Sequence, residues 1–68
     1  MAFTVRQARR LCEKTQSEMA KEMNMCRDSY RKIEENPEKA TVAQAREISR
    51  ITGIPLDKIF FGSDIYLK

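Results

Sequence analysis

The sequence predicts a compact all-α domain of five short helices. Three Thr residues are each followed, three positions later, by Gln or Glu and then by apolar residues at helical spacing, which is the pattern of a capping box at a helix start. No segment sustains the apolar and polar alternation of a half-buried strand, so a sheet is not expected. With 68 residues, of which 41% are hydrophobic, the chain has room for one domain with one core.

The first two helices are expected to begin after Thr4 and Thr15. The first should span about residues 5–13, and its buried side chains should be Ala8, Leu11 and Cys12. The second should span about residues 16–23, with an inner stripe made of Met19, Ala20 and Met23.

A tight turn is expected at Asn24-Met25, because Asn tolerates the left-handed backbone conformation that ends helices. The third helix should then run from Cys26 to about Glu35 with Tyr30 and Ile33 on its buried side. Asn36-Pro37 should stop it, since the residue before a proline disfavours helical geometry.

A polar loop at residues 37–40 leads to the fourth helix, which should begin at Thr41 and end at Gly53. Its apolar stripe should be Val42, Ala45, Ile48 and either Ile51 or Thr52. Pro55 suits a first helical turn and should open a fifth helix whose inward side chains are Leu56, Ile59 and Phe60. Residues 64–67 could extend as a single strand.

The net charge of +3 is unevenly distributed along the chain. Residues 1–32 contain eight Lys or Arg and four acidic residues, whereas residues 33–68 contain five and six. The basic half favours an anionic partner, although ordinary solvated surfaces share this asymmetry.

The inventory of reactive side chains argues against an enzyme and against a bound metal or other cofactor. There is no histidine, and no paired nucleophile and base occurs at a recognisable spacing. Cys12 and Cys26 alone cannot complete a four-ligand zinc site. Small buried thiols are the interpretation we favour for both, and a disulfide between them is the alternative.

Targeting signals are not evident in the sequence. The longest stretches without Asp, Glu, Lys or Arg, such as residues 51–56, are far shorter than the roughly 20 apolar residues that cross a bilayer. No basic flank followed by an apolar run and a cleavage site is found near the N-terminus. We therefore expect no membrane association and a cytoplasmic protein.

The second and third helices have the lengths and the short connection of a helix-turn-helix unit. Small Ala20 lies where the two helices would cross. The outer face of the third helix should carry a polar stripe, which consists of Arg27, Asp28, Arg31, Lys32 and Glu35. Arg and Lys can donate to guanine and Asp can accept from cytosine, so these types suit base recognition in the major groove. A merely solvated helix face is the alternative.

Two stretches of the sequence resemble the lambda-repressor-like, Cro and XRE-type family of DNA-binding proteins. One comprises Thr-Gln-Ser-Glu-Met-Ala at residues 15–20, Asn-Met-Cys-Arg at residues 24–27, and Tyr30, Ile33 and Glu34. The other, at residues 48–60, resembles the family's fourth and fifth helices. Together they cover about residues 5–61. The resemblance implies a bacterial or phage regulator of transcription that binds double-stranded DNA and acts by occupying its operator. A repressor, which blocks polymerase, is the role we favour, and an activator, which recruits polymerase, is the alternative.

The resemblance also implies contacts for individual residues. Gln16 would clamp a phosphate, although an ordinary helix-start residue is the alternative for it. The other backbone contacts would be Thr15, Ser29, Asn36, Lys39 and Thr41. Bases would be contacted by Arg27, Asp28 and Lys32, and either bases or phosphate by Arg31. Arg9 and Glu34 match a pair that forms an internal salt bridge in related repressors.

Three positions depart from the family pattern. Asn24 replaces the turn glycine but preserves left-handed geometry. Cys26 replaces the Ser or Thr that usually caps the third helix and is a poorer acceptor. Glu35 stands where many relatives have a neutral residue, so it should repel DNA slightly or disfavour particular sequences.

The expected organisation is a DNA-binding domain at residues 1–61 followed by a tail at residues 62–68. A homodimer is expected at least on DNA, since relatives bind two half-sites about one helical turn apart. Ile65, Tyr66 and Leu67 are the candidate dimer contact, or they cover the chain's own core. The competing function is a protein-interaction module, such as an antitoxin or anti-repressor, built on the same fold.

Overall fold

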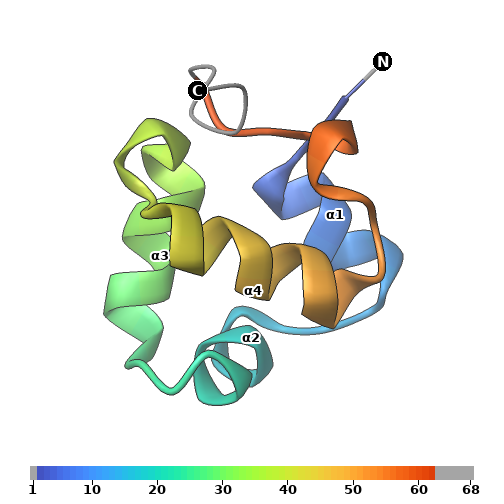
Figure 1. Ribbon diagram of the computed structural model, residues 1–68. Coiled ribbons are helices and arrows are strands. Elements are labelled where there is room, and N and C mark those ends of the chain that lie inside the picture. The colour runs from blue at the N-terminus through green and yellow to red at the C-terminus, as the bar shows by residue number, and fades with distance from the viewer. Residues whose placement is uncertain (1, 63–68) are drawn as a thin grey trace.

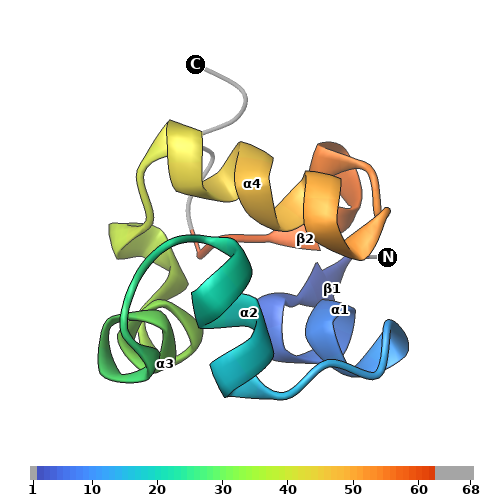
Figure 2. The same cartoon turned by 90° about the horizontal axis from the view of Figure 1, so that it is seen from below.

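The computed structural model describes residues 2–62, and within them the chain forms four short α-helices and two very short strands (Figure 1). The helices are α1 (Val5–Leu11), α2 (Gln16–Glu22), α3 (Arg27–Glu35) and α4 (Val42–Thr52). Single 3-10 turns η1 (Pro37–Lys39) and η2 (Leu56–Lys58) follow α3 and α4, and the strands are β1 (Phe3–Thr4) and β2 (Ile59–Phe60). Figure 2 shows α4 on one side of the molecule and α1, α2 and α3 on the other.

No helix in residues 2–62 is both long enough and apolar enough to cross a membrane.

The three expected capping boxes are confirmed at Thr4, Thr15 and Thr41. In each box the Thr hydroxyl accepts a hydrogen bond from the backbone amide three residues later, and the Gln or Glu side chain there accepts one from the Thr amide. The start of α3 differs, because Cys26 is its N-cap and forms no side-chain hydrogen bond to the helix amides. In this part of the chain, three of the four α-helices therefore have a start that is fixed by residues adjacent in the sequence.

The expected left-handed turn residues are also confirmed, with φ angles of 60° at Asn24 and 75° at Gly53. The end of α1 was predicted too late. Glu13 has a φ of 58°, so the helix stops at Leu11. The side chain of Leu11, on the last turn, is consequently 60% exposed and was wrongly assigned to the core.

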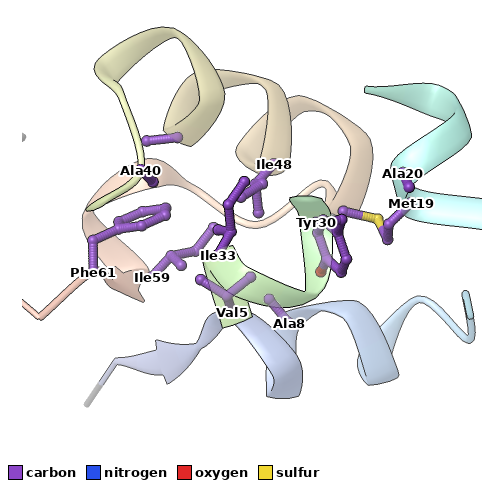
Figure 3. Close-up of a cluster of buried hydrophobic side chains, with 11 residues drawn as sticks. Val5, Ala8, Met19, Ala20, Tyr30, Ile33, Ala40, Ile48, Ile59 and Phe61 are labelled. Atoms are coloured by element: carbon purple, nitrogen blue, oxygen red, sulfur yellow. The ribbon is translucent and has the colours of Figure 1, made fainter. Parts of the chain in front are cut away.

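The core lies between α4 and the other three helices (Figure 3). Its buried side chains are Val5, Ala8, Met19, Ala20, Tyr30, Ile33, Ala40, Ala45, Ile48, Ile59 and Phe61. Met25, in the turn between α2 and α3, is partly buried and packs against this cluster. Val42 was assigned to the core wrongly: it is the first residue of α4, at the edge of the packed region, and is 48% exposed.

The prediction of a fifth α-helix is wrong, and so is the prediction that no sheet forms. Pro55 has φ −54° and ψ 144°, which is not helical, and after η2 strand β2 pairs in parallel with β1, Phe3 opposite Ile59. A strand alternates its side chains between two faces, whereas a helix would place neighbouring residues 59 and 60 on one side. Ile59 and Phe61 are accordingly fully buried, and Phe60 is 50% exposed instead of facing inward. The possible strand at residues 64–67 lies outside the described residues.

The two thiols are free, and the expectation that both are buried is wrong. Cys12 is half-buried, and its Sγ lies 3.1 Å from the Arg9 carbonyl oxygen. Cys26 is exposed because it precedes α3, and its Sγ lies 3.2 Å from the Ser29 hydroxyl.

Candidate nucleic-acid interface

Helices α2 and α3 pack directly against each other and are joined by a tight turn at Met23, Asn24 and Met25 (Figure 2). The turn is closed by two backbone hydrogen bonds, from Asn24 to Lys21 at 3.1 Å and from Met25 to Ala20 at 2.9 Å. Ala20 is only 2% exposed, so a larger side chain there would push the helices apart. This geometry is that of a helix-turn-helix unit.

The outward face of α3 carries the polar stripe that the sequence predicts. Tyr30 and Ile33 are buried on its inner face. Of the predicted stripe, Arg27, Asp28, Lys32 and Glu35 are exposed and Arg31 is half-buried. Arg27 forms no ion pair with any residue among positions 2–62, and it lines a shallow hollow of about 510 Å³ beside the turn, next to Lys21 and Asn24. Its guanidinium is thus available to an external acceptor.

Arg31 is held differently from Arg27, a difference that was not expected from the sequence. Its Nη2 lies 2.7 Å from Asp28 Oδ1, and its Nη1 lies 2.7 Å from Glu35 Oε2. Lys32 Nζ is 3.9 Å from the second Asp28 oxygen. The hydrogen bond from Arg31, aided by the charges of Arg31 and Lys32, lowers the pKa of the Asp28 carboxyl. The Asp28 carboxyl therefore stays charged at neutral pH. Asp28 and Glu35 share Arg31 between them.

Three of the six residues expected along the DNA backbone come together at one hollow beside α3 and η1. Ser29, Lys32, Asn36 and Lys39 line one hollow of about 300 Å³, together with Ile33 and Gln44. Thr41, the N-cap of α4, is hydrogen-bonded to Gln44 in a capping box. Gln44 was not among the expected contacts, although its spacing from Thr41 could have indicated that it lies near them. Two lysines and several neutral donors in one concave surface suit an anionic group.

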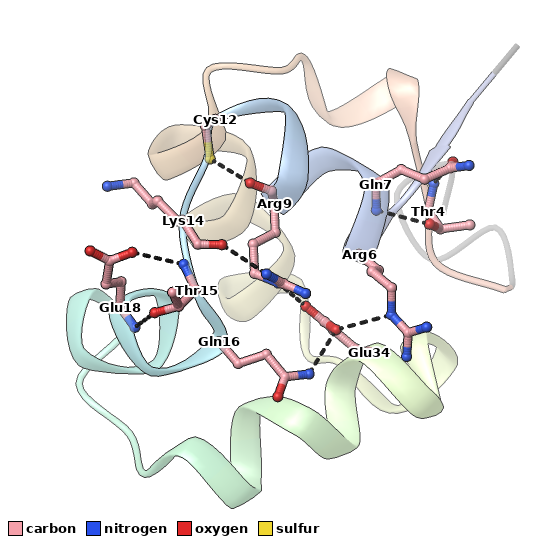
Figure 4. Close-up of polar contacts among 10 residues, drawn as sticks. All are labelled: Thr4, Arg6, Gln7, Arg9, Cys12, Lys14, Thr15, Gln16, Glu18 and Glu34. Atoms are coloured by element: carbon pink, nitrogen blue, oxygen red, sulfur yellow. Dashed lines mark hydrogen bonds and ion pairs between the residues drawn. The ribbon is translucent and has the colours of Figure 1, made fainter.

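The Glu34 carboxylate is the centre of a network that joins α1, α2 and α3 (Figure 4). Arg9 Nε lies 2.6 Å from Glu34 Oε2, so the two residues that the resemblance implied as a pair are in contact. Glu34 Oε1 accepts from Gln16 Nε2 at 3.0 Å and from Arg6 Nε at 3.5 Å. The side chains of Glu34 and Arg9 are 0% and 12% exposed. Arg9 also donates to the Lys14 carbonyl oxygen at 2.8 Å, so the pair fixes the loop before α2.

Gln16 has a structural partner, Glu34, that is not apparent from the sequence. The hydrogen bond to Glu34 uses one of its two amide hydrogens and leaves the second hydrogen and the amide oxygen. Thr15, directly before it, is exposed and uses its hydroxyl in the capping box. No spacing rule links residues 16 and 34, since they meet only once α2 and α3 have packed.

Burial and hydrogen bonding act in opposite directions on Glu34. Burial alone raises the pKa of its carboxyl, but hydrogen bonds from Arg9 and Gln16 and the Arg9 charge outweigh it, and the pKa is lowered. The same contact raises the pKa of Arg9. The Tyr30 hydroxyl is buried beside the pair, and within residues 2–62 it has no partner in hydrogen-bond geometry, while burial raises the pKa of its phenol. Arg9 and Glu34 are therefore both charged at neutral pH.

A protein-family model described as helix-turn-helix matches residues 5–59. The match extends from the first residue of α1 to the first residue of β2 and includes every residue named above as a candidate contact. No curated protein and no solved structure gives a match to this chain.

Proposed function

This chain belongs to the helix-turn-helix family of the XRE and lambda-repressor type, whose members are DNA-binding regulators of transcription, and from that premise we propose that it is a sequence-specific repressor. It would bind double-stranded DNA in the cytoplasm of a bacterium, at a bacterial or phage operator, without catalytic activity or a cofactor. The domain would comprise residues 1–61.

The observation that carries this proposal is the exposed outer face of α3. Helix α3 would lie in the major groove, where the base-contacting residues would be Arg27, Asp28, Arg31 and Lys32. Arg27 is at the first turn of α3, the part of a recognition helix that reaches base edges, and its guanidinium can donate to guanine O6 and N7 together.

Backbone contacts would hold the domain in register on the duplex without reading sequence. Gln16 would donate its second amide hydrogen to a phosphate while Glu34 holds the first. The hollow at the end of α3 would receive another phosphate through Ser29, Asn36 and Lys39. Thr15 and Thr41 would contribute from the N-caps of α2 and α4.

Two substitutions separate reading from positioning. Arg27→Ala should cost about 1–3 kcal/mol on the best duplex and relax the preference at one base pair. Gln16→Ala should weaken binding to all duplexes by a similar factor, because phosphate contacts carry no direct sequence information. Affinities for a selected duplex and an unrelated duplex at fixed salt provide the measurement.

Arg46→Ala is the control for Arg27→Ala, since it removes the same charge from the exposed surface of α4. It should lower both affinities slightly and equally. A ratio of specific to non-specific affinity that is unchanged by Arg27→Ala would refute base reading through this residue.

One feature favours the competing function, a protein-interaction module. Phe3 and Leu11 are 38% and 60% exposed, and with Gln7 and Arg10 they line a hollow of about 350 Å³. Salt distinguishes the two functions, because neutralising phosphates releases counterions and gives a steep dependence of affinity on salt concentration. A protein that shows no salt-dependent binding to any duplex would not be the regulator proposed here.

We also propose that the chain dimerises at least on DNA, with the tail at residues 62–68 as the contact. Most of this tail lies outside the described residues. Deleting residues 63–68 should weaken cooperative operator binding, measured as stoichiometry and affinity on a two-half-site duplex. Unchanged values for both would remove the tail from the interface.

A further inference from the structure

The outer face of α3 contains an arginine bracketed by two carboxylates. Asp28 lies one turn before Arg31 and Glu35 one turn after it, and each accepts a hydrogen bond of 2.7 Å from a different terminal nitrogen. A guanidinium has five N–H donors, so one hydrogen on each terminal nitrogen and the Nε hydrogen remain. The side chains of Arg31, Asp28 and Glu35 are 41%, 63% and 47% exposed.

Exposed ion pairs of this kind add little to folding stability. They do fix the orientation of the Arg31 guanidinium and surround it with negative charge. A phosphate approaching Arg31 would also approach two carboxylates, which repel it. A guanine edge carries no net charge and is repelled less, and its O6 and N7 can accept the donors that the carboxylates leave. Arg27, which has no such bracket in the described structure, is open to either kind of partner.

We propose that Asp28 and Glu35 are specificity-determining residues, which hold Arg31 for base edges and withhold it from phosphates. This inference rests on the proposed function of α3 as the reading helix. On this proposal Glu35 acts by holding Arg31, and not simply by repelling DNA. The two carboxylates lower affinity for arbitrary sequence more than affinity for the operator.

The test compares Glu35→Gln with Glu47→Gln. Glu47 forms an equivalent exposed pair with Arg50 on α4, at 2.6 Å, so its substitution changes net charge equally without touching α3. Dissociation constants are measured over a range of salt concentrations for a duplex selected from a random pool and for an unrelated duplex.

Glu35→Gln should tighten binding to the unrelated duplex, lower the ratio of specific to non-specific affinity at least about threefold, and steepen the salt dependence on the unrelated duplex by about one unit, as one more phosphate contact would. Glu47→Gln should leave the ratio unchanged. Both substitutions are then repeated with Arg31→Met, where the effect of Glu35→Gln on the ratio should disappear.

Two results overturn the inference while the proposed function stands. One is an equal effect of Glu35→Gln and Glu47→Gln, and the other is an effect of Glu35→Gln that persists with Arg31→Met, since both indicate general repulsion.

The hold of the two carboxylates on Arg31 is also measured without DNA, by nitrogen-15 NMR of the arginine side chains. Rotation of the Arg31 guanidinium should be slow in the unsubstituted protein and faster in Glu35→Gln. Fast rotation in both refutes the inference whatever DNA binding shows, whereas slow rotation without salt-dependent duplex binding refutes the proposed function and, with it, the role in specificity.

Discussion

The two faces of α3 carry the same kinds of charged group in opposite surroundings. On the inner face, the Glu34 carboxylate is fully covered and accepts from three side chains. On the outer face, Asp28 and Glu35 are 63% and 47% exposed and share Arg31. Water screens the outer pairs but not the inner one. The inner face should therefore determine whether the helices stay packed, and the outer face which DNA they bind.

The largest effect is expected from Glu34→Gln, which would leave the Arg9 guanidinium covered without its counter-charge. We expect the free energy of unfolding to fall by about 3 kcal/mol, the lower end for a broken buried pair because Arg9 is 12% exposed. For a chain of this size the melting temperature should fall by more than about 10 °C. Thermal melts followed by circular dichroism test this, with Glu47→Gln as the exposed control. An unchanged melting temperature would mean that the Arg9–Glu34 pair contributes as little to stability as the exposed pairs of the outer face.

Acid should remove the same contribution. Because the pKa of Glu34 is lowered from its ordinary value of 4.5, its stabilisation is fully present above pH 4.5 and is lost as pH falls through the folded-state pKa. The unsubstituted protein should therefore lose more stability than Glu34→Gln as pH falls below 4.5. The other carboxyls are common to both proteins, so the difference between the two stability curves isolates Glu34. Parallel curves would mean that Glu34 keeps an ordinary pKa.

Tyr30→Phe should have a small effect despite complete burial. The Tyr30 hydroxyl has no hydrogen-bond partner within residues 2–62, so its removal takes away a desolvated polar group without breaking a bond. Stability should change by less than about 1 kcal/mol or increase. Chemical denaturation measures it. A loss as large as that of Glu34→Gln would show that the hydroxyl belongs to the Glu34 network.

The smallest effect on folding is expected on the outer face. Glu35→Gln and Asp28→Asn should each change the melting temperature by less than about 3 °C, because solvent-exposed pairs contribute little. High salt sharpens the contrast, since it screens exposed pairs far more than buried ones. In 1 M salt the effect of Glu34→Gln should persist. A large destabilisation by Glu35→Gln would erase the distinction between the two faces.

The helix-turn-helix was predictable from sequence because its signals are local. The capping box at Thr15 and the left-handed Asn24 act within a few residues, and so fixed where α2 begins and where it turns. The structure of the C-terminal segment was not predictable from sequence, because residues 59–61 are apolar and fit either a helix or a strand. Strand β2 exists because β1, from the other end of the chain, supplies its hydrogen bonds. That partner has no local signature.

The candidate site divides in the same way. Residue types and spacing identified the outer stripe of α3, and the positions of Asp28, Arg31 and Glu35 already satisfy the rule for neighbouring helix side chains. The contact between Gln16 and Glu34 depends on the packing of two helices, which no pattern in the sequence measures.

The parallel pairing of β1 with β2 has a consequence for the order of folding. It closes a loop that contains α1 to α4, and the entropic cost of closing a loop grows with its length. Contacts within the helix-turn-helix connect residues close in sequence and form quickly by comparison. The strand pair should thus form last and open first, so that its amide protons exchange with solvent through partial openings in which α2 and α3 remain folded.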